Sequence, residues 1–272
     1  MNMTLKSALL GSASFALMMA ATGSTQAQSF DGFYVGAQMG YSSFNVKTNE
    51  SSMGRLHSTG SAFGNRIGNI GQNGSRGMTG ATGGLFAGYG RTFGRFYVGG
   101  ELEGGYSGAS GRSSNRFSLV EGCGAVPSTA TLTTKIRAKE TYGGSLRLGY
   151  VISPGALLYS RFGFQRTRFH VRSSLSAAEG GVTVTNNMIN QSKSFNGFKF
   201  GLGAELALAS MFPTANLGNS FVRLDWSHTW YQRKSFFGSG STTTSSRELT
   251  SSHSLEVKPT ENRFMLGIGI RF

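Results

Sequence analysis

Eight stretches of this chain place large apolar residues at every second position, with glycine, polar or charged residues between them. In "GFKFGLGAEL", Phe198 and Phe200 alternate with Lys199 and Gly201. Successive side chains of a β-strand point to opposite faces, so this period of two gives each strand one apolar and one polar face. Glycines interrupt every window long enough for a helix. The pattern therefore predicts an all-β chain. The other stretches are residues 32–41, 83–91, 97–106, 142–150, 158–166, 221–230 and 263–272.

The connections between these stretches indicate which β architecture forms. "TFGR", "ISPG" and "SMFPTANLGN" are short, whereas the four intervening segments are polar and roughly 25 to 35 residues long. Structureless loops of that length are unusual in compact soluble domains. Short turns on one side and long loops on the other are typical of an antiparallel transmembrane β-barrel.

The residue types on the two faces favour the same architecture. In a membrane barrel the large apolar side chains face lipid, and the polar set fills the interior. Eight strands enclose a space just wide enough for side chains, which suits glycine beside Arg, Lys and Glu. A soluble core would instead pack bulky apolar groups against each other. We therefore expect an eight-stranded transmembrane barrel; a soluble periplasmic barrel of lipocalin type is the less favoured alternative.

The first 27 residues have the features of a cleaved secretory signal. Lys6 precedes an apolar run from Ala8 to Ala21, and small residues surround Ala27. The run is too short to cross a membrane as a helix. Residues 28–272 are then expected to form a single barrel domain. Cys123 is the single cysteine, which excludes a disulfide framework and a thiolate metal cluster, and its role stays open.

The chain is strongly basic, with a formal net charge of +14. Such a charge indicates attraction to an acidic surface. For an exported chain, anionic lipid headgroups fit this role better than nucleic acid does.

The two ends of the mature chain resemble a known family. "GFYVGAQMGY" directly after the signal, and the ending "GIGIRF", are similar to the small outer-membrane β-barrels of Gram-negative bacteria: the OmpA-like, opacity-protein and alphaproteobacterial surface-antigen, porin-like group. The resemblance implies eight antiparallel strands in the outer membrane, short periplasmic turns and four long extracellular loops. It also implies that the barrel-assembly machinery reads the last strand, through Gly267, Ile270 and Phe272.

Charged residues on the inward faces form the first candidate site. Both signs occur on neighbouring strands, and burying an unpaired ion is costly, so we expect each carboxylate to pair with a base and plug the lumen. A narrow ion pore is the alternative. These residues are Glu101, Glu103, Arg147, Arg161, Lys199, Glu205, Arg223, Asp225, Arg263 and Arg271.

Basic residues in the expected outer loops and upper strand ends form the second candidate site. Lipopolysaccharide presents phosphates at this height, and arginine pairs with phosphate through two parallel hydrogen bonds. Solvation of the loops is the plainer interpretation. The residues are Lys47, Arg55, Arg66, Arg76, Arg112, Arg116, Lys135, Arg137, Lys139, Arg166, Arg168, Arg172, Arg233 and Lys234.

Catalysis finds little support in the sequence. Outer-membrane proteases of omptin type need several Asp and His residues at the rim, and here Asp31 and Asp225 are the only aspartates. No Ser and His spacing indicates a nucleophile. We predict a structural, surface-exposed protein that contributes to envelope integrity, without enzymatic activity, metal or cofactor. Capture of haem or another small ligand, for example by His170 and His253, stays an alternative, and the oligomeric state is open.

Overall fold

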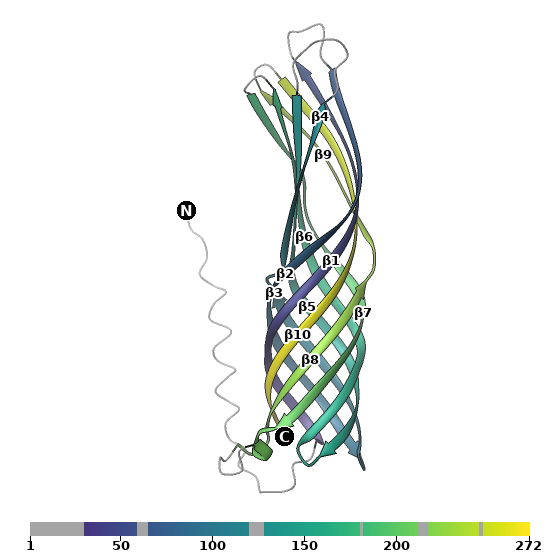
Figure 1. The fold of residues 1–272 in the computed structure, drawn as a ribbon, viewed down its shortest axis with the longest axis vertical. Helices are drawn as coiled ribbons and strands as arrows, with labels where there is room; N and C mark the ends of the chain where they lie inside the picture. The colour runs from purple at the N-terminus through teal and green to yellow at the C-terminus, as the bar shows by residue number, and fades with distance from the viewer. Residues whose placement is uncertain (1–29, 59–64, 120–127, 180–181, 212–216, 245–246) are drawn as a thin grey trace.

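The computed structural model describes residues 30–58, 65–119, 128–179, 182–211, 217–244 and 247–272, and nearly all of them are in β-strands (Figure 1). The predicted all-β class is confirmed. No helix in these ranges is long and apolar enough to cross a membrane. The elements are β1 (Gly32–Ser58), β2 (Asn65–Phe93), β3 (Phe96–Ser107), β4 (Ser110–Leu119), β5 (Ser128–Ser153), β6 (Ala156–Glu179), β7 (Val182–Ala207), α1 (Leu208–Met211), β8 (Ser220–Tyr231), β9 (Lys234–Thr244) and β10 (Arg247–Arg271).

The strands close into a ring of eight. Each strand pairs antiparallel with its neighbours in the order β1, β2, β3, β5, β6, β7, β8, β10, and β10 returns to β1 from Tyr34↔Arg271 to Ser58↔Arg247. After a short break, β4 continues the path of β3, and β9 continues the path of β8. The ten segments therefore make eight passes, and the predicted eight-stranded barrel is confirmed.

Tight turns gather at one end of the barrel, which we call the turn end. β2 turns into β3 at Gly94 (φ +66°), and β5 turns into β6 at Gly155 (φ +105°). Glycine adopts these left-handed conformations without the steric cost of a side chain. The predicted "TFGR" and "ISPG" turns are thus confirmed, and α1 lies in the third connection.

At the opposite end the long polar segments continue as strands for most of their length. β1, β2, β5, β6, β7 and β10 each have 24 to 29 residues. The molecule is therefore a tall cylinder rather than a short barrel with free loops (Figure 1).

The upper part of this cylinder consists of two facing sheets. Above the last β7–β8 pair, Gly197↔Tyr231, β9 pairs with β10 and has no ladder with β7 in the described chain. On the other side, a single bridge, Thr79↔Ser110, joins β2 to β4. Sheet I is therefore β2-β1-β10-β9, sheet II is β4-β5-β6-β7, and we call the part below them the closed barrel.

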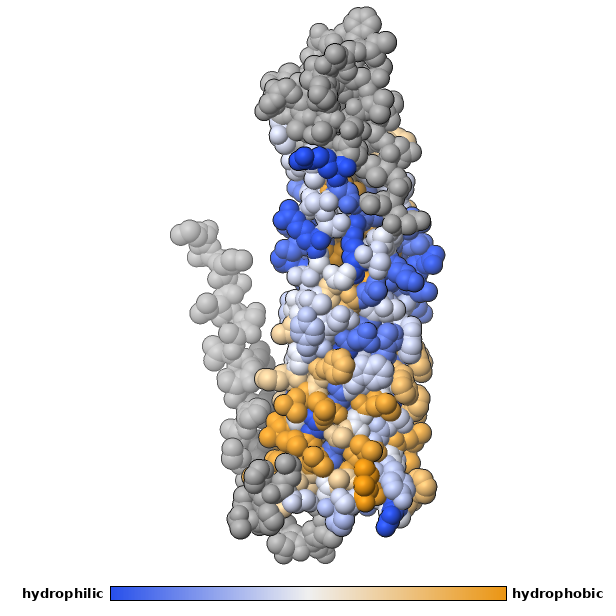
Figure 2. Space-filling model, viewed as in Figure 1, coloured by the Kyte–Doolittle hydropathy of each residue, from blue (hydrophilic) through white to orange (hydrophobic). Residues whose placement is uncertain are grey.

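Exposed apolar side chains on every strand of the closed barrel form a hydrophobic band around it, one face of which is visible in Figure 2. On β3 the outward Phe96 and Tyr106 are 66% and 56% exposed and ten residues apart. With about 3.4 Å per residue and a strand tilt of about 40°, this spacing corresponds to about 26 Å along the barrel axis. The apolar belt of a transmembrane barrel is about 25 Å tall.

At the top of this band the apolar side chains change from the outward face of the strands to the inward face. On β1, the outward Met39 and Tyr41 are exposed and the inward Ser42 is buried, but two residues further up the inward residue is the buried Phe44 and the outward neighbour Asn45 is exposed. The alternation itself continues without a break. Below the exchange the outside suits lipid; above it, the outside suits water and the inside forms an apolar core.

Candidate functional site

The closed barrel has a charged interior. All ten charged residues that the alternation assigns to the inward face are buried there, none more than 9% exposed. Their strands supply both signs at similar heights, so each carboxylate has a cation within reach. They are Glu101, Glu103, Arg147, Arg161, Lys199, Glu205, Arg223, Asp225, Arg263 and Arg271.

Glu101 on β3 is the centre of this network. Its carboxylate accepts hydrogen bonds from Arg223 (2.6 Å), Arg161 (2.9 Å) and Arg147 (3.4 Å), and a further one from the Tyr34 hydroxyl (3.1 Å). Three cations from β5, β6 and β8 thus share one acceptor.

Two further carboxylates extend the network in opposite directions. Glu103 pairs with Lys199 and accepts a bond from Arg161 at 2.8 Å. Glu205 pairs with Arg147 at 2.8 Å and with Arg271 at 2.5 Å. Through Arg271, the last strand is tied to β7 inside the barrel.

Aromatic rings line the cationic groups at the turn end. The guanidinium carbon of Arg147 lies 3.8 Å from the ring centroid of Tyr159, and that of Arg223 lies 3.4 Å from Phe86. Desolvated cation–π contacts of this kind stabilise by about 2 kcal/mol. Sequence reasoning based on charge alone missed these rings, although Phe86 and Tyr159 stand at inward positions of the alternation.

A second polar cluster, also missed, lies at the top of the closed barrel. The Tyr231 hydroxyl donates to Glu261 (2.6 Å), which also accepts from Gln165 (2.7 Å) and pairs with Arg263 (2.7 Å). Glu261 stands two residues before Arg263, so its inward direction could have been predicted from the period of two.

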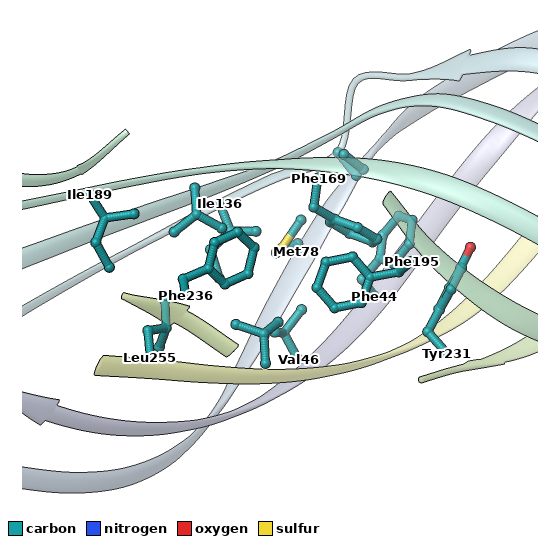
Figure 3. Close-up of a cluster of buried hydrophobic side chains, with 14 of the residues drawn as sticks. Phe44, Val46, Met78, Ile136, Phe169, Ile189, Phe195, Tyr231, Phe236 and Leu255 are labelled. Atoms are coloured by element: carbon teal, nitrogen blue, oxygen red, sulfur yellow. The ribbon is translucent and has the colours of Figure 1, made fainter. Parts of the chain in front are cut away.

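Apolar clusters close the interior above and below these charges. Above them, Phe44 of sheet I packs edge-on against Phe169 of sheet II, with ring centroids 5.5 Å apart (Figure 3). Below them, Phe30, Tyr97, Leu157 and Tyr159 form a buried cluster. A cavity beside Glu103 has a volume of only about 10 Å³, which is room for one water molecule. In the described part of the closed barrel, ion pairs and aromatic rings therefore fill the space around these charges.

The last strand carries the residues expected to guide assembly. The backbone of Phe272 donates to Phe33 of the first strand at 2.8 Å, and its ring is 54% exposed at the lower edge of the band. Ile270 is half-buried. Gly267 faces inward, where a Cβ would approach the Arg223 side chain to 3.0 Å.

The outer face of sheet II is densely cationic just above the hydrophobic band. Arg112, Lys135 and Arg172 are cross-strand partners in one row, and Arg137 pairs with His170 in the next. Further down, Arg166 pairs with Tyr142 at the edge of the band. We call this surface the cationic face; it consists of Arg112, Arg116, Lys135, Arg137, Lys139, Arg166, Arg168, His170 and Arg172.

The cations of this face lie close enough to influence each other. The pKa of His170 is lowered by partial burial and then by repulsion from Lys139, Arg172 and Arg137. Like charges directly opposite one another on neighbouring strands destabilise a sheet. Among the described side chains of sheet II, Glu140 is the carboxylate next to this face. Most of the repulsion between its cations is therefore not offset by a neighbouring negative charge.

Several predicted outer cations lie elsewhere. The prediction for Arg76 was wrong: its inward position places it between the sheets, where it pairs with the buried Glu50 at 2.5 Å. Lys234 is only half-exposed, with its ammonium 5.9 Å from the Phe195 ring centre. Arg233 is exposed and pairs with Glu256, and Lys47 is exposed on sheet I. The side chains of Arg55 and Arg66 lie outside the described part of the chain.

The structure does not bring the candidate histidines together. His253 is 3% exposed on the inner face of β10, and burial together with Arg76 lowers its pKa to about 4. His170 lies on the outer face of β6, where it contacts Ser192 at 3.0 Å. They therefore cannot share one iron. Within the described residues no group of three or more His, Cys, Asp or Glu is arranged to hold a metal ion. Cys123 and the predicted signal segment lie outside these residues.

Comparison with known proteins identifies the family. Residues 13–272 match the model of the outer membrane protein beta-barrel domain. The chain belongs to this family. It is an outer-membrane β-barrel protein located in the bacterial outer membrane, as the resemblance of its two ends predicted. Because short turns lie on the periplasmic side of such barrels and long loops on the extracellular side, we assign the turn end to the periplasm. No curated protein matches the sequence.

Among the solved structures to which this chain is similar are proteins of Escherichia coli, Pseudomonas aeruginosa and Yersinia pestis. The outer membrane protease OmpT of Escherichia coli has a TM-score of 0.42 and 10% identity, covering 89% of this chain and 97% of its own. OprG of Pseudomonas aeruginosa has a TM-score of 0.42 and 12% identity, covering 91% and 99%. Ail, the attachment invasion locus protein of Yersinia pestis, has a TM-score of 0.25 and 11% identity, covering 81% and 98%. All three likenesses are distant.

Proposed function

We propose that this outer-membrane protein has a structural role: it strengthens the outer leaflet by holding the phosphates of lipopolysaccharide against its wall. The observation that carries the proposal is the cationic face, which begins at Arg166, directly above the hydrophobic band. Exposed arginines at this height meet the headgroup layer, where each basic group contributes about 1 kcal/mol to binding an anionic surface. Arginine also fits phosphate through paired hydrogen bonds.

The packed interior supports the structural role over transport. Ion pairs fill the lumen of the closed barrel, and the aromatic cluster around Phe44 covers them. Eight strands leave no wide channel. We therefore propose that the protein is a closed barrel without pore activity. Conductance of the folded protein in planar bilayers tests this part of the proposal. Ion-selective conductance steps that vanish in the Glu103→Gln variant would contradict it.

The proposal also excludes an enzymatic role. Asp225 is buried in the lumen, where it accepts a bond from Tyr159 at 2.6 Å and pairs with Arg223 at 3.0 Å. A protease rim built on acidic groups has no counterpart in the described part of the chain. The basic, exposed surface fits binding rather than turnover.

Calorimetric titration of the detergent-folded barrel with lipopolysaccharide tests the proposed contact. In Arg166→Gln/Arg168→Gln two exposed cations at the edge of the band are neutralised, and we expect the affinity of the folded barrel for lipopolysaccharide to fall about thirty-fold. Arg91→Gln/Arg95→Gln is the matched control, because it removes the same charge at the exposed periplasmic end. Equal affinity in all three proteins would refute the contact with lipopolysaccharide.

A further inference from the structure

This inference rests on the proposed function. The cationic face extends further along the barrel axis than the lipid headgroup layer that it is proposed to contact. Arg166 and Arg172 are six residues apart on β6, which is about 20 Å along the strand. At a barrel tilt of 35–45° the rise along the axis is about 15 Å. The headgroup region of a bilayer leaflet is only about 5–8 Å thick. In the upper part of the molecule the strands run more steeply (Figure 1), which makes the rise larger.

The face therefore divides into two levels. The lower tier is Lys139, Arg166 and Arg168, next to Tyr142 and Phe164 at the edge of the band. The upper tier is the row Arg112, Lys135 and Arg172, which lies four residues above the lower tier on β5 and β6, and Arg137 lies between the two levels. Lipid phosphates at one height can reach the lower tier but not the upper one.

The upper tier is the more crowded level. Lys135 stands directly between Arg112 and Arg172 in the cross-strand register, so three cations occupy three adjacent strands in one row. This arrangement is unfavourable for the sheet on its own, since like charges at opposed positions repel. None of the ion pairs found in the described residues involves these side chains. A bound anion at this level would relieve the repulsion.

Hydroxyl groups surround these cations on the same outer face. Ser114 and Thr133 contact each other at 3.1 Å beside Arg112, and Ser176 contacts Thr185 at 2.9 Å above Arg172. Cations with flanking hydroxyls offer paired bonds to phosphate and single bonds to sugar hydroxyls. The surface is exposed and contains no large apolar side chain, so a fatty acyl chain does not fit it.

We propose that the upper tier is a separate binding site for a phosphorylated saccharide, supplied by the core sugars that lipopolysaccharide carries above its lipid. The lower tier contacts phosphates at the lipid level. The protein then holds each lipopolysaccharide molecule at two heights, so that removing core phosphates weakens binding even when the lipid part is intact.

A lipid-free probe separates the two tiers. The phosphorylated core oligosaccharide released from lipopolysaccharide is titrated calorimetrically into detergent-folded barrel, beside the same oligosaccharide after phosphatase treatment. The variants are Arg112→Gln/Arg172→Gln in the upper tier and Arg166→Gln/Arg168→Gln in the lower tier. Lys47→Gln/Lys258→Gln is the control, because these exposed cations oppose each other on the outer face of sheet I. Heat modifiability on gels verifies that each variant is folded.

The proposal predicts that the phosphorylated oligosaccharide binds the wild type, the lower-tier variant and the control alike, and binds the upper-tier variant about thirty-fold more weakly. Phosphatase treatment should abolish binding. Equal binding by the upper-tier variant would overturn the proposal, as would undiminished binding after phosphatase. Tighter binding of a sulfated glycan, tested in parallel, would overturn it in favour of an extracellular polyanion. If only whole lipopolysaccharide binds, and only the lower-tier variant loses it, the proposed function stands and the two-tier inference fails.

Discussion

Neutralising Glu101 should destabilise the barrel more than any comparable change of a surface carboxylate. Glu101→Gln keeps the shape of the side chain and removes its charge. Three arginines from three strands then lose the negative charge that they share at 2.6 to 3.4 Å, and an amide NH2 donor replaces one of the two acceptor oxygens, in a site where Glu101 is 3% exposed. The arginines keep their second partners Glu205, Glu103 and Asp225, but the interior then holds more buried positive than negative charge, which is the costly way to break a buried ion pair.

The size of the effect follows from the charges of the network. The closed barrel buries five carboxylates (Glu101, Glu103, Glu205, Asp225 and Glu261) against six cations (Arg147, Arg161, Lys199, Arg223, Arg263 and Arg271). Removing Glu101 changes this balance to four against six. Breaking one buried pair costs about 3–5 kcal/mol. We expect a loss in this range, equivalent to about a hundred- to several-thousand-fold in the folding equilibrium.

Equilibrium unfolding of the barrel in phospholipid vesicles, titrated with guanidinium chloride, measures this loss. Glu256→Gln is the matched control, because Glu256 is 34% exposed and pairs with the 60% exposed Arg233 at 3.1 Å. Exposed pairs contribute about 0–1 kcal/mol. If Glu101→Gln unfolds within 1 kcal/mol of Glu256→Gln, the interior network does not hold the barrel together, and the reasoning is wrong.

Three further changes test other parts of the molecule. Phe44→Ala should destabilise the two upper sheets by about 3–5 kcal/mol, seen as faster hydrogen exchange in β9 with β3 unchanged; uniform exchange in all strands would contradict a separate upper core. His253 has a folded pKa of about 4 against about 6.5 in an unfolded chain, so the unfolded state binds the proton first and stability is lost as pH falls from about 6.5 to 4. The wild type should lose about 3 kcal/mol more than His253→Leu over that window, and parallel pH curves would refute this. Phe272→Ala should reduce the heat-modifiable, assembled fraction in cells without changing the stability of the refolded protein; normal assembly would remove the proposed signal role.

The sequence predicted the closed barrel well, because lipid imposes one rule on every strand there. Outward residues such as Leu102 and Phe164 must be apolar, and the narrow inside leaves room for glycine and paired charges. The two tight turns were equally readable, since Gly94 and Gly155 occupy conformations that favour glycine.

The upper sheets were missed for a physical reason that is visible in β1. Tyr41 ends the run of outward apolar residues, so the polar stretch after it resembled a loop. The strand continues, but its outside now meets water and its inside meets another sheet, which exchanges the faces without breaking the period of two. Phe44 and Val46 are the residues that carried this signal. The same exchange explains Arg76, whose inward position in β2 was read as a loop cation. Partners such as Glu50 could not be assigned, because the sequence does not give the register between distant strands.

The central claim is that apolar side chains of the closed barrel face lipid while charges fill its interior, and the two tryptophans test it most directly. Both lie on the outward face of β8: Trp226 within the band and Trp230, 49% exposed, at its upper edge. Trp230→Phe and Trp226→Phe leave one tryptophan each, and fluorescence is measured in vesicles whose lipids carry bromine at known depths. The account predicts that deep bromines quench Trp226 most and shallow bromines quench Trp230 most. Tryptophan emission that no brominated lipid quenches would mean that these rings lie in a dry protein core, and would contradict the account.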